Sequence, residues 1–487
     1  MTSATGMTRV VEKLSPRVVK CRLSSLMRAC ARARVIVAAH AIARARRASF
    51  SFIVPSRRRR GMTRAGDDET ATTDGENSPI VVRPIADAAW RPLRGMTRAE
   101  LRLRHTLPTG QSFRWRPRGE DGSDYVGVVG RRVVRARETG RDGGGVEYKV
   151  YCRPSNETSE DDERVIREYF NADVELEALY ETFSKADGRF RALAPRIDGA
   201  RTLRQDPSEC LFSFICSSNN HISRIHGMVG KMCSRYGDAL PVTMDDVARD
   251  DVEETKTTTG ADESTPSTTT TTFHAFPSVA QVIERATEEE LRALGFGYRA
   301  KFIVGAAETL ARVAGQLGTT PDEYLRRLRD ETPYLDAHAA LLALPGVGPK
   351  VSACVCLFSL DKHRAVPVDT HVWRFACEHY APELRDAKSV TPKIMRAVER
   401  RMEDIFGPYA GWAHNALFIA ELRDVRETLP ERLRTPKKRT TPTTTTPTTT
   451  PTKTTKTTRR KTDDVVAASE RTDTVPPPFE SPSRPFA

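Results

Sequence analysis

The chain has 487 residues, of which 38% are hydrophobic, and its formal net charge is +13. This length allows roughly two to three domains, but the hydrophobic share is too low for the whole chain to be packed core. No stretch approaches the roughly 18 apolar residues of a transmembrane helix, which argues against a membrane protein, and the positive charge favours polyanionic partners, nucleic acid first.

Residues 1–78 are predicted to be a disordered targeting segment and linker. Up to about residue 66 the chain is rich in arginine and nearly free of acids, which is typical of an organellar transit peptide. A disordered basic arm that binds nucleic acid is the alternative. Residues 67–78 (DDETATTDGENS) are an acidic, polar linker.

Residues 79–185 are predicted to form a β-rich subdomain. The segments DYVGVVGRRVVRARE (124–138) and GGGVEYKVYCRP (143–154) combine alternating apolar residues with glycine turns, as antiparallel strands do. Upstream, RAELRLRHTLPTGQSFRWRP (98–117) runs into a Thr-Gly turn and an aromatic strand.

From Asp161 the apolar residues recur with helical spacing, and residues 186–426 are predicted to be an all-helical domain. The tract 253–272 (EETKTTTGADESTPSTTTTT) cannot bury apolar surface and is predicted to be an exposed, disordered insertion. The fold class is therefore α+β. None of the nine cysteines forms a C-x-x-C pair, which indicates reduced thiols in an intracellular compartment.

Residues 427–487 are Thr/Pro-rich and are predicted to be a disordered tail. The basic clusters at 437–439 (KKR) and 459–461 (RRK) resemble nuclear localisation signals. With the arginine-rich N-terminus, they predict a nuclear location, a mitochondrial or plastid location, or both.

The stretch that carries the chemistry begins at LPGVG (344–348), where an amphipathic helix ends and Pro349 suits the first turn of the next one. Such a hairpin exposes backbone N–H groups and the positive end of a helix to a phosphate. An ordinary tight turn is the alternative for this motif alone.

Lys350 falls in the first turn of that second helix, where the helix dipole disfavours a cation. The same field favours the neutral amine that a nucleophile needs, although a solvated lysine that grips a phosphate is the alternative. Cys354 is one helical turn further on the same face, either as a thiolate partner to the lysine or as a small packed side chain.

Asp369 follows Pro367 and precedes a helical run, which predicts a helix N-cap. A capping carboxylate is held in a fixed position. The separation from Lys350 leaves room for one helix and a return, so both side chains can meet beside the hairpin. There the carboxylate could stabilise an oxocarbenium ion or assist proton transfer.

Six motifs in this order resemble one known family. They are LPTGQSFRW (107–115), CLFSFICSSNN (210–220), FGYRAKF (296–302), LPGVGPKVSACVC (344–356), AVPVDTHVW (365–373) and YAGWA (409–413). The chain is similar to the helix–hairpin–helix–Gly/Pro/Asp superfamily of DNA glycosylases and, within it, to eukaryotic 8-oxoguanine DNA glycosylases. The resemblance implies a TBP-like β-rich subdomain followed by a helical glycosylase domain.

By this resemblance, Lys350 attacks the sugar C1′ of a flipped nucleotide, with Asp369 as the essential carboxylate, and a Schiff base leads to β-elimination. Gly110 offers its carbonyl to N7–H of 8-oxoguanine, while Cys354 and Phe418 sandwich the purine. The residues expected to contact DNA are Asn219, Arg224, Tyr298, Arg299, Gly346, Gly348, Val351 and His371. Tyr298 resembles the wedge at the vacated site, and Asn219, Arg224 and Arg299 resemble the group that holds the orphaned cytosine.

The expected partner is damaged double-stranded DNA, and the protein is expected to be a monomer. The chemistry requires no metal or other cofactor, although the hairpin carbonyls are a candidate site for a structural cation.

Two positions depart from the family. His414 replaces a glutamine that reads the Watson–Crick edge of the base, and neutral histidine cannot fully imitate an amide. We expect His414 still to accept a hydrogen bond from the base, with weaker discrimination, and base binding to fall as the ring protonates below about pH 6.5. His221 replaces an asparagine, with a smaller expected effect.

Two alternatives stay open at this point. A sister glycosylase of different base preference is the first, although iron–sulfur relatives carry four cysteines after this domain and no cysteine follows Cys377. A non-catalytic helix–hairpin–helix module that binds DNA is the second, and it would need neither Lys350 nor Asp369.

Overall fold

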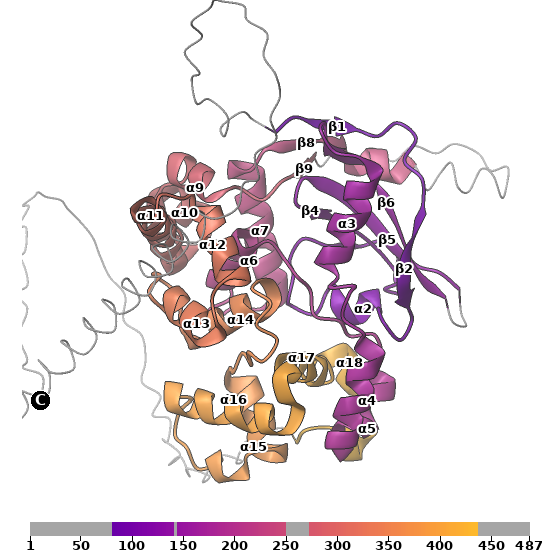
Figure 1. Cartoon of the computed structure of the whole chain (residues 1–487), viewed down its shortest axis with the longest axis vertical. Helices are drawn as coiled ribbons and strands as arrows, with labels where there is room; N and C mark the ends of the chain where they lie inside the picture. Colours follow the sequence, from indigo (N-terminus) through magenta and orange to yellow (C-terminus); the bar gives the residue numbers. More distant parts are fainter. Residues whose placement is uncertain (1–79, 141–143, 250–271, 437–487) are drawn as a thin grey trace, which may run out of the picture. The chain divides into compact units, whose positions relative to one another are not determined.

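The computed structural model describes residues 80–140, 144–249 and 272–436 (Figure 1). The predicted targeting segment, most of the predicted insertion and most of the predicted tail lie outside the described residues. Within the described residues, an antiparallel sheet is followed along the chain by many helices, so the α+β class is confirmed.

The N-terminal sheet has five antiparallel strands in the order β2-β6-β5-β4-β3. Their bounds are Arg91–Thr97 (β2), Gly145–Val150 (β6), Arg132–Glu138 (β5), Asp124–Val129 (β4) and Arg116–Pro117 (β3). The tight β4–β5 hairpin pairs Val129 with Arg132, and Gly130 adopts φ +58° in the turn. Strand alternation with glycine turns therefore gave the correct elements.

The two faces of this sheet pack against different elements. Tyr125, Val134 and Tyr148 face Ile166 of α3 (Ser159–Tyr169), with the short helix α2 (Leu103–Thr106) nearby. Val126 faces the opposite side, as expected for successive residues of a strand.

That opposite side is covered by a β-hairpin, which corrects the prediction of an all-helical second region. The hairpin consists of β8 (Ala239–Thr243) and β9 (Thr272–His274), and the two strands flank the insertion. Thr272, assigned to the insertion from sequence, is the first residue of β9. Two further strands, β1 (Val82–Pro84) and β7 (Cys152–Pro154), pair antiparallel with each other.

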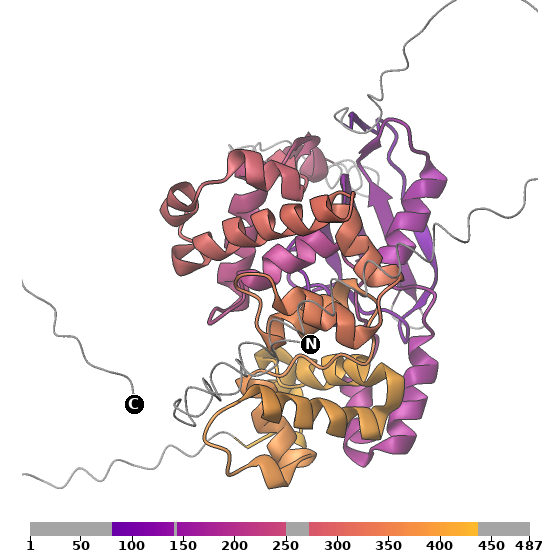
Figure 2. The same cartoon turned by 60° about the vertical axis from the view of Figure 1, so that its left-hand side comes forward.

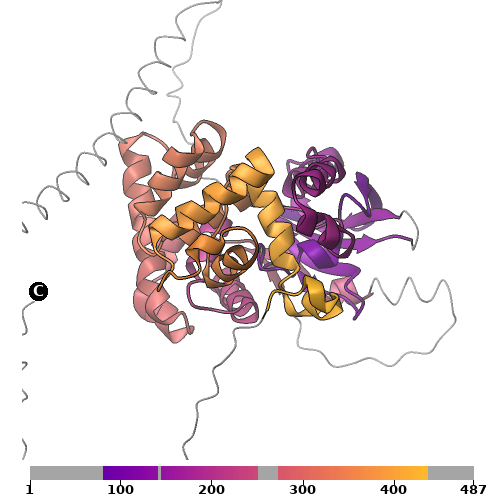
Figure 3. The ribbon, with the colours of Figure 1, turned by 90° about the horizontal axis from the view of Figure 1, so that it is seen from below.

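The helices share one large hydrophobic core. They are α4 (Leu176–Ala186), α5 (Gly188–Leu193), α6 (Pro207–Ile215), α7 (Ile222–Tyr236), α9 (Val279–Arg285), α10 (Glu288–Ala293), α11 (Ala300–Gln316), α12 (Pro321–Asp330), α13 (Tyr334–Leu342), α14 (Pro349–Ser359), α15 (Thr370–His379), α16 (Pro392–Phe406), α17 (Ala410–Ile419) and α18 (Arg423–Thr428). The orange-to-yellow C-terminal helices lie below the salmon helices and the purple sheet in Figure 1, and they are in the foreground when the molecule is seen from below (Figure 3).

The predicted domain boundary at residue 185 falls inside α4. This helix packs on the C-terminal helices, with the Phe183 ring edge-on to Phe406 at 5.6 Å between centroids, and α4 and α5 lie beside those helices in two views (Figures 1 and 2). An amphipathic pattern marks the buried face of a helix but not the element it meets, so the sequence did not show that α4 packs against the C-terminal helices.

The predicted end of the folded chain at residue 426 is also wrong. Helix α18 continues to Thr428, a 3-10 turn follows at Glu431–Leu433, and Leu429 and Thr435 are each only 1% exposed. Arg189 of α5 donates a hydrogen bond to the carbonyl of Leu433 at 2.9 Å. The segment from residue 429 to residue 435 therefore packs over α5.

Among the described residues, no helix is long and apolar enough to span a bilayer. The seven described cysteines are all buried and unpaired, as the sequence predicted: Cys152, Cys210, Cys216, Cys233, Cys354, Cys356 and Cys377.

Candidate active site

The predicted hairpin connects α13 to α14. Gly346 adopts φ +78°, and a Cβ placed on it would come within 2.5 Å of Phe302 Cβ. Gly348 is the N-cap of α14, and a Cβ there would meet nothing within 4 Å. The two glycines therefore have different purposes: the first makes the turn possible, and the second leaves open space at the helix N-terminus.

Alanine substitutions should separate these purposes. Gly346→Ala is expected to lower the free energy of unfolding by about 1–3 kcal/mol, because it adds backbone strain and overlaps Phe302. Gly348→Ala, the matched control for folding, should lose less than about 1 kcal/mol but weaken DNA binding, because the new methyl group obstructs the phosphate approach. Urea unfolding and binding to a duplex measure the two effects. Equal stability losses would contradict this assignment.

Lys350 lies in the first turn of α14 and reaches into a pocket between α14, α15 and α17. Its Nζ donates to Ser217 Oγ at 3.4 Å and lies 5.1 Å from the centre of the Phe214 ring. Neither neighbour is a carboxylate, so the amine is not held in an ion pair by these contacts. The amine is thus not tied to a carboxylate and is free to approach an electrophile in the pocket.

Asp369 is the N-cap of α15, as predicted. Its Oδ1 accepts hydrogen bonds from the backbone N–H groups of His371 at 2.8 Å and Val372 at 2.9 Å. These bonds fix the carboxylate through one oxygen, and among the described residues no hydrogen bond engages Oδ2. The second oxygen is thus available to a charge that develops in the pocket.

The pocket joins side chains that are far apart in the sequence. Lys350 and Asp369 both line it, together with Gly110, Cys354, His414 and Phe418. The structure therefore brings both predicted catalytic residues and all four predicted base-pocket residues to one cavity. Thr109, Gln111, Phe214, Phe358, Pro367, Val372 and Asn415 complete the lining.

Cys354 is a thiol in this pocket. It is 2% exposed, and burial raises its pKa to about 11, although the Lys350 charge acts in the opposite direction. Of the two sequence interpretations, the thiolate partner is therefore wrong at neutral pH, and Cys354 offers the pocket a small, polarisable surface.

Gly110 has a conformation that favours glycine. Its φ is +89°, and an added Cβ would contact Ile222 Cδ1 at 3.0 Å. Any larger residue would strain the turn and press on the first residue of α7. The glycine thus fixes the path of the backbone along the pocket wall.

The predicted DNA-contacting residues include a connected group around the turn after α6. Tyr298 is 44% exposed, and its hydroxyl donates to the Ser218 carbonyl at 2.9 Å. Arg299 is only 3% exposed and donates to the carbonyls of Ser218 and Asn219. Asn219 itself has φ +48°. In this state Arg299 supports the turn, while Tyr298 presents its ring to solvent.

His221 has a local role that explains how it can replace an asparagine. It is the N-cap of α7, and its Nδ1 accepts a hydrogen bond from the backbone N–H of Arg224 at 3.4 Å. The Arg224 and His371 side chains are exposed, whereas Val351 is 4% exposed in the first turn of α14.

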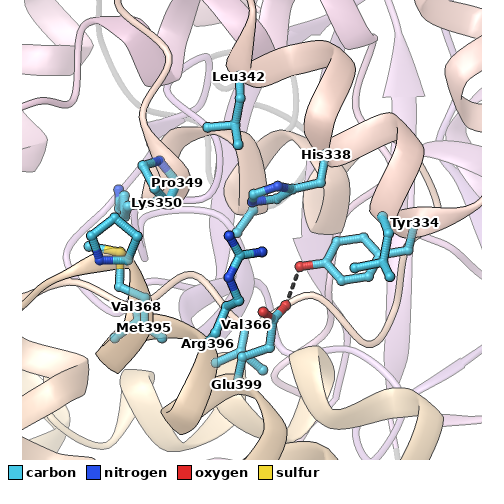
Figure 4. A pocket seen from close by; sticks show the side chains of 13 residues that line it. Tyr334, His338, Leu342, Pro349, Lys350, Val366, Val368, Met395, Arg396 and Glu399 are labelled. Atoms are coloured by element: carbon cyan, nitrogen blue, oxygen red, sulfur yellow. Dashed lines mark hydrogen bonds between the residues drawn. The ribbon is translucent and has the colours of Figure 1, made fainter. Parts of the chain in front are cut away.

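A second pocket lies on the other side of the first turn of α14 (Figure 4). It is lined by Pro349 and Lys350 and by residues of α13 and α16. There Tyr334 of α13 donates a hydrogen bond to Glu399 of α16, and burial raises the pKa of that carboxyl. This contact joins α13, the first helix of the hairpin, to α16. It therefore holds the hairpin in place on the side away from the first pocket.

Sequence reasoning missed Ser217, Phe214 and Asn415. Ser217 and Phe214 belong to CLFSFICSSNN, which was noted as a motif without a role for either side chain. Asn415 had a visible signal, because His414 and Asn415 are adjacent polar residues in the otherwise apolar helix AGWAHNALFI. Buried polar residues at such positions need a partner.

Comparisons with known proteins identify the relatives of this chain. Residues 95–211 match the family model described as the N-terminal domain of 8-oxoguanine DNA glycosylase, and residues 212–400 match the HhH-GPD superfamily of base excision DNA repair proteins. The chain is 42% identical over 333 residues to the N-glycosylase/DNA lyase OGG1 of Arabidopsis thaliana, across 68% of this chain and 80% of that protein. It is 32% identical over 358 residues to the N-glycosylase/DNA lyase of Saccharomyces cerevisiae, across 67% and 85%.

A solved structure has the same fold. The apo form of the Clostridium acetobutylicum 8-oxoguanine glycosylase/lyase superposes with a TM-score of 0.51 at 26% identity, over 69% of this chain and 98% of that one. The hairpin, the lysine that follows it and the capping aspartate, on this fold, define a helix–hairpin–helix–Gly/Pro/Asp base excision repair protein. With the N-terminal domain match and the two eukaryotic relatives, the chain belongs to the 8-oxoguanine DNA glycosylase family.

Proposed function

We propose that this protein is a bifunctional DNA glycosylase and AP lyase that removes 8-oxoguanine, and related oxidised purines, opposite cytosine in duplex DNA. The observation that carries the proposal is the single pocket in which Lys350 and Asp369 meet Gly110, Cys354 and Phe418. A DNA-binding module without catalysis has no use for such a pocket.

In the proposed reaction each of these side chains has one task. The damaged nucleotide leaves the duplex, and its base enters the pocket between Cys354 and Phe418, with N7–H directed at the Gly110 carbonyl. The neutral amine of Lys350 attacks C1′, the bond from C1′ to the base breaks, and the base departs with a proton. The Asp369 carboxylate stabilises the positive charge that develops on the sugar.

The lyase step uses the same lysine. After the base has left, the amine and C1′ form a Schiff base as the sugar ring opens. Loss of a proton from C2′ then expels the 3′-phosphate and nicks the strand, and hydrolysis of the Schiff base restores Lys350. Each step consumes only water and bonds of the substrate itself.

The DNA is held from three directions in this proposal. The hairpin N–H groups at Gly346, Gly348 and Val351, with His371, bind the backbone of the damaged strand. Tyr298 fills the space of the flipped nucleotide. The remaining members of the expected set, Asn219, Arg224 and Arg299, hold the orphaned cytosine.

Borohydride trapping tests the function. Wild-type protein is incubated with duplexes that contain 8-oxoguanine, a formamidopyrimidine, an oxidised pyrimidine or an undamaged guanine, each opposite cytosine. We expect a covalent adduct with the oxidised purines. Adducts with oxidised pyrimidines alone would favour a sister glycosylase, and no adduct with any duplex would favour a non-catalytic module.

The pH dependence of His414 is a second test. The ring is 4% exposed and stacked with Phe418 at 22° between planes, and burial lowers the pKa of His414 to about 4. From the sequence we expected base binding to fall below about pH 6.5, which is the value for an exposed histidine. Because the ring is buried, that expectation is wrong. Excision by wild type and by His414→Gln should follow parallel profiles between about pH 5 and 8.

The free energy of unfolding, unlike the excision rate, should depend on the ionisation of His414 at mildly acidic pH. The unfolded chain takes up a proton on His414 near pH 6.5, but the folded pocket does so only near 4. As pH falls between those values, wild type should lose stability relative to His414→Gln by up to about 1.4 kcal/mol per pH unit. Urea unfolding at pH 7 and 5 measures the difference. No difference between the two proteins would contradict a buried, neutral His414.

Several expectations stay predictions of this proposal. The protein acts as a monomer and without an added cofactor, and the hairpin carbonyls hold a structural cation at most. Location in the nucleus, in a mitochondrion or plastid, or in both depends on segments outside the described residues.

A further inference from the structure

Two polar side chains of the pocket wall, Thr109 and Gln111, are engaged by the protein itself. Thr109 Oγ1 donates to the Thr106 carbonyl at 3.1 Å. The Gln111 amide donates to the carbonyls of Thr106 and Arg201, both at 2.9 Å, and accepts from the backbone N–H of Leu203 at 2.9 Å. These groups build the wall and have little capacity left for a ligand.

Two adjacent residues of α17 differ from this pattern. His414 is buried, and neither ring nitrogen has a hydrogen-bond partner among the described residues. Asn415 is 3% exposed and lines the pocket, and its one hydrogen bond among those residues runs from Nδ2 to Thr202 Oγ1 at 3.5 Å, the limit for such a bond. A carboxamide has two donors and an oxygen with two acceptor sites, so most of the Asn415 amide is unused.

Unused polar groups of this kind are costly in a protein interior unless a ligand engages them. Lys350 and Asp369 act on the sugar in the proposed reaction, and Cys354 and Phe418 contact the faces of the base. Only His414 and Asn415 are left among the pocket side chains to read the edge of the base by hydrogen bonds. His414 offers an imidazole ring, whereas Asn415 offers a carboxamide.

We propose that Asn415 is a specificity-determining residue that reads the Watson–Crick edge of the flipped purine. The inference rests on the proposed function and names the group that discriminates the base. 8-Oxoguanine presents two N–H donors and one carbonyl acceptor along that edge. With Nδ2 directed at Thr202, the Asn415 amide oxygen has two acceptor sites for the N1–H and exocyclic N–H donors, whereas neutral His414 has a single acceptor nitrogen. Asn415 therefore supplies the amide chemistry that His414 lacks.

The test compares base excision with the lyase step on one protein. Asn415→Ala and the volume-preserving Asn415→Leu are assayed on 8-oxoguanine opposite cytosine and on a duplex with a preformed abasic site. Excision should fall by roughly 10–100-fold, because the base loses a hydrogen bond and leaves its own groups unpaired in the pocket. Cleavage at the abasic site, which has no base to read, should be retained.

A lesion that lacks the exocyclic amine locates the contact. With 8-oxohypoxanthine in place of 8-oxoguanine, the penalty of Asn415→Ala should shrink, since one partner of the hydrogen bond is already absent. Thr202→Val is the matched control: it removes the hydroxyl that contacts Asn415 from outside the pocket and should keep excision near the wild-type rate.

Three results would overturn the proposal: normal 8-oxoguanine excision by both Asn415 variants, equal loss of excision and abasic-site cleavage in both, or a penalty that is the same for the two lesions. Failure of the proposed function is a separate result. It would appear as wild-type protein that cleaves abasic sites but releases no oxidised purine.

Discussion

Lys350→Gln is expected to abolish the borohydride-trapped adduct and to slow base excision by on the order of 10⁴-fold or more, which is the scale for removal of a covalent nucleophile. Glutamine keeps the length of the side chain near Ser217 and Phe214 but has no amine to form a Schiff base. Single-turnover release of 8-oxoguanine and gel detection of the adduct measure both effects.

Lys185→Gln is the matched control for this substitution. Lys185 lies on α4 in an exposed ion pair with Glu181 at 3.3 Å, remote in sequence from every pocket residue. It should retain wild-type excision and trapping. If the Lys350 variant still formed an adduct at a comparable rate, another amine would be the nucleophile and the proposed mechanism would be wrong.

Asp369 combines a structural and a chemical task, and two substitutions separate them. Asp369→Asn keeps the N-cap, since asparagine caps about as well as aspartate, but removes the negative charge. Its stability should stay close to wild type while excision falls by roughly 10²–10⁴-fold, the range for lost electrostatic and proton-transfer assistance.

Asp369→Ala removes the cap as well. It should show a similar loss of excision together with a loss of about 1 kcal/mol in the free energy of unfolding, because the N–H groups of His371 and Val372 lose their acceptor. Thermal unfolding and single-turnover kinetics on both variants supply the comparison. Full activity in the asparagine variant would show that capping is the whole role of Asp369.

Local patterns predicted much of the fold and of the site. The strands β4, β5 and β6 follow from alternating apolar residues and glycine turns, and the hairpin before Lys350 follows from LPGVG with a proline at the next helix start. The Asp369 cap follows from its place just before a helical run. In each case the signal and the structure lie within a few residues of each other.

Predictions failed where the answer depended on distant contacts. Helix α4 looks the same in sequence whichever subdomain it packs against, and the ionisation of Cys354 and His414 depends on burial by several elements. The β8–β9 hairpin is difficult to see because its strands are separated by the long insertion. Asn415 was missed because a role was given to its neighbour through family resemblance instead of through unmet hydrogen bonds.

The packing of residues 429–435 over α5 determines where a truncated form of the protein can end. Helix α17, which carries His414 and Asn415, is followed directly by α18. The next segment contains Leu433, whose carbonyl accepts a hydrogen bond from Arg189. An expression fragment cut at residue 426 would remove buried Leu429 and Thr435 and the Leu433 carbonyl that accepts the hydrogen bond from Arg189. Such a fragment should therefore be less stable to urea than one that ends at residue 436.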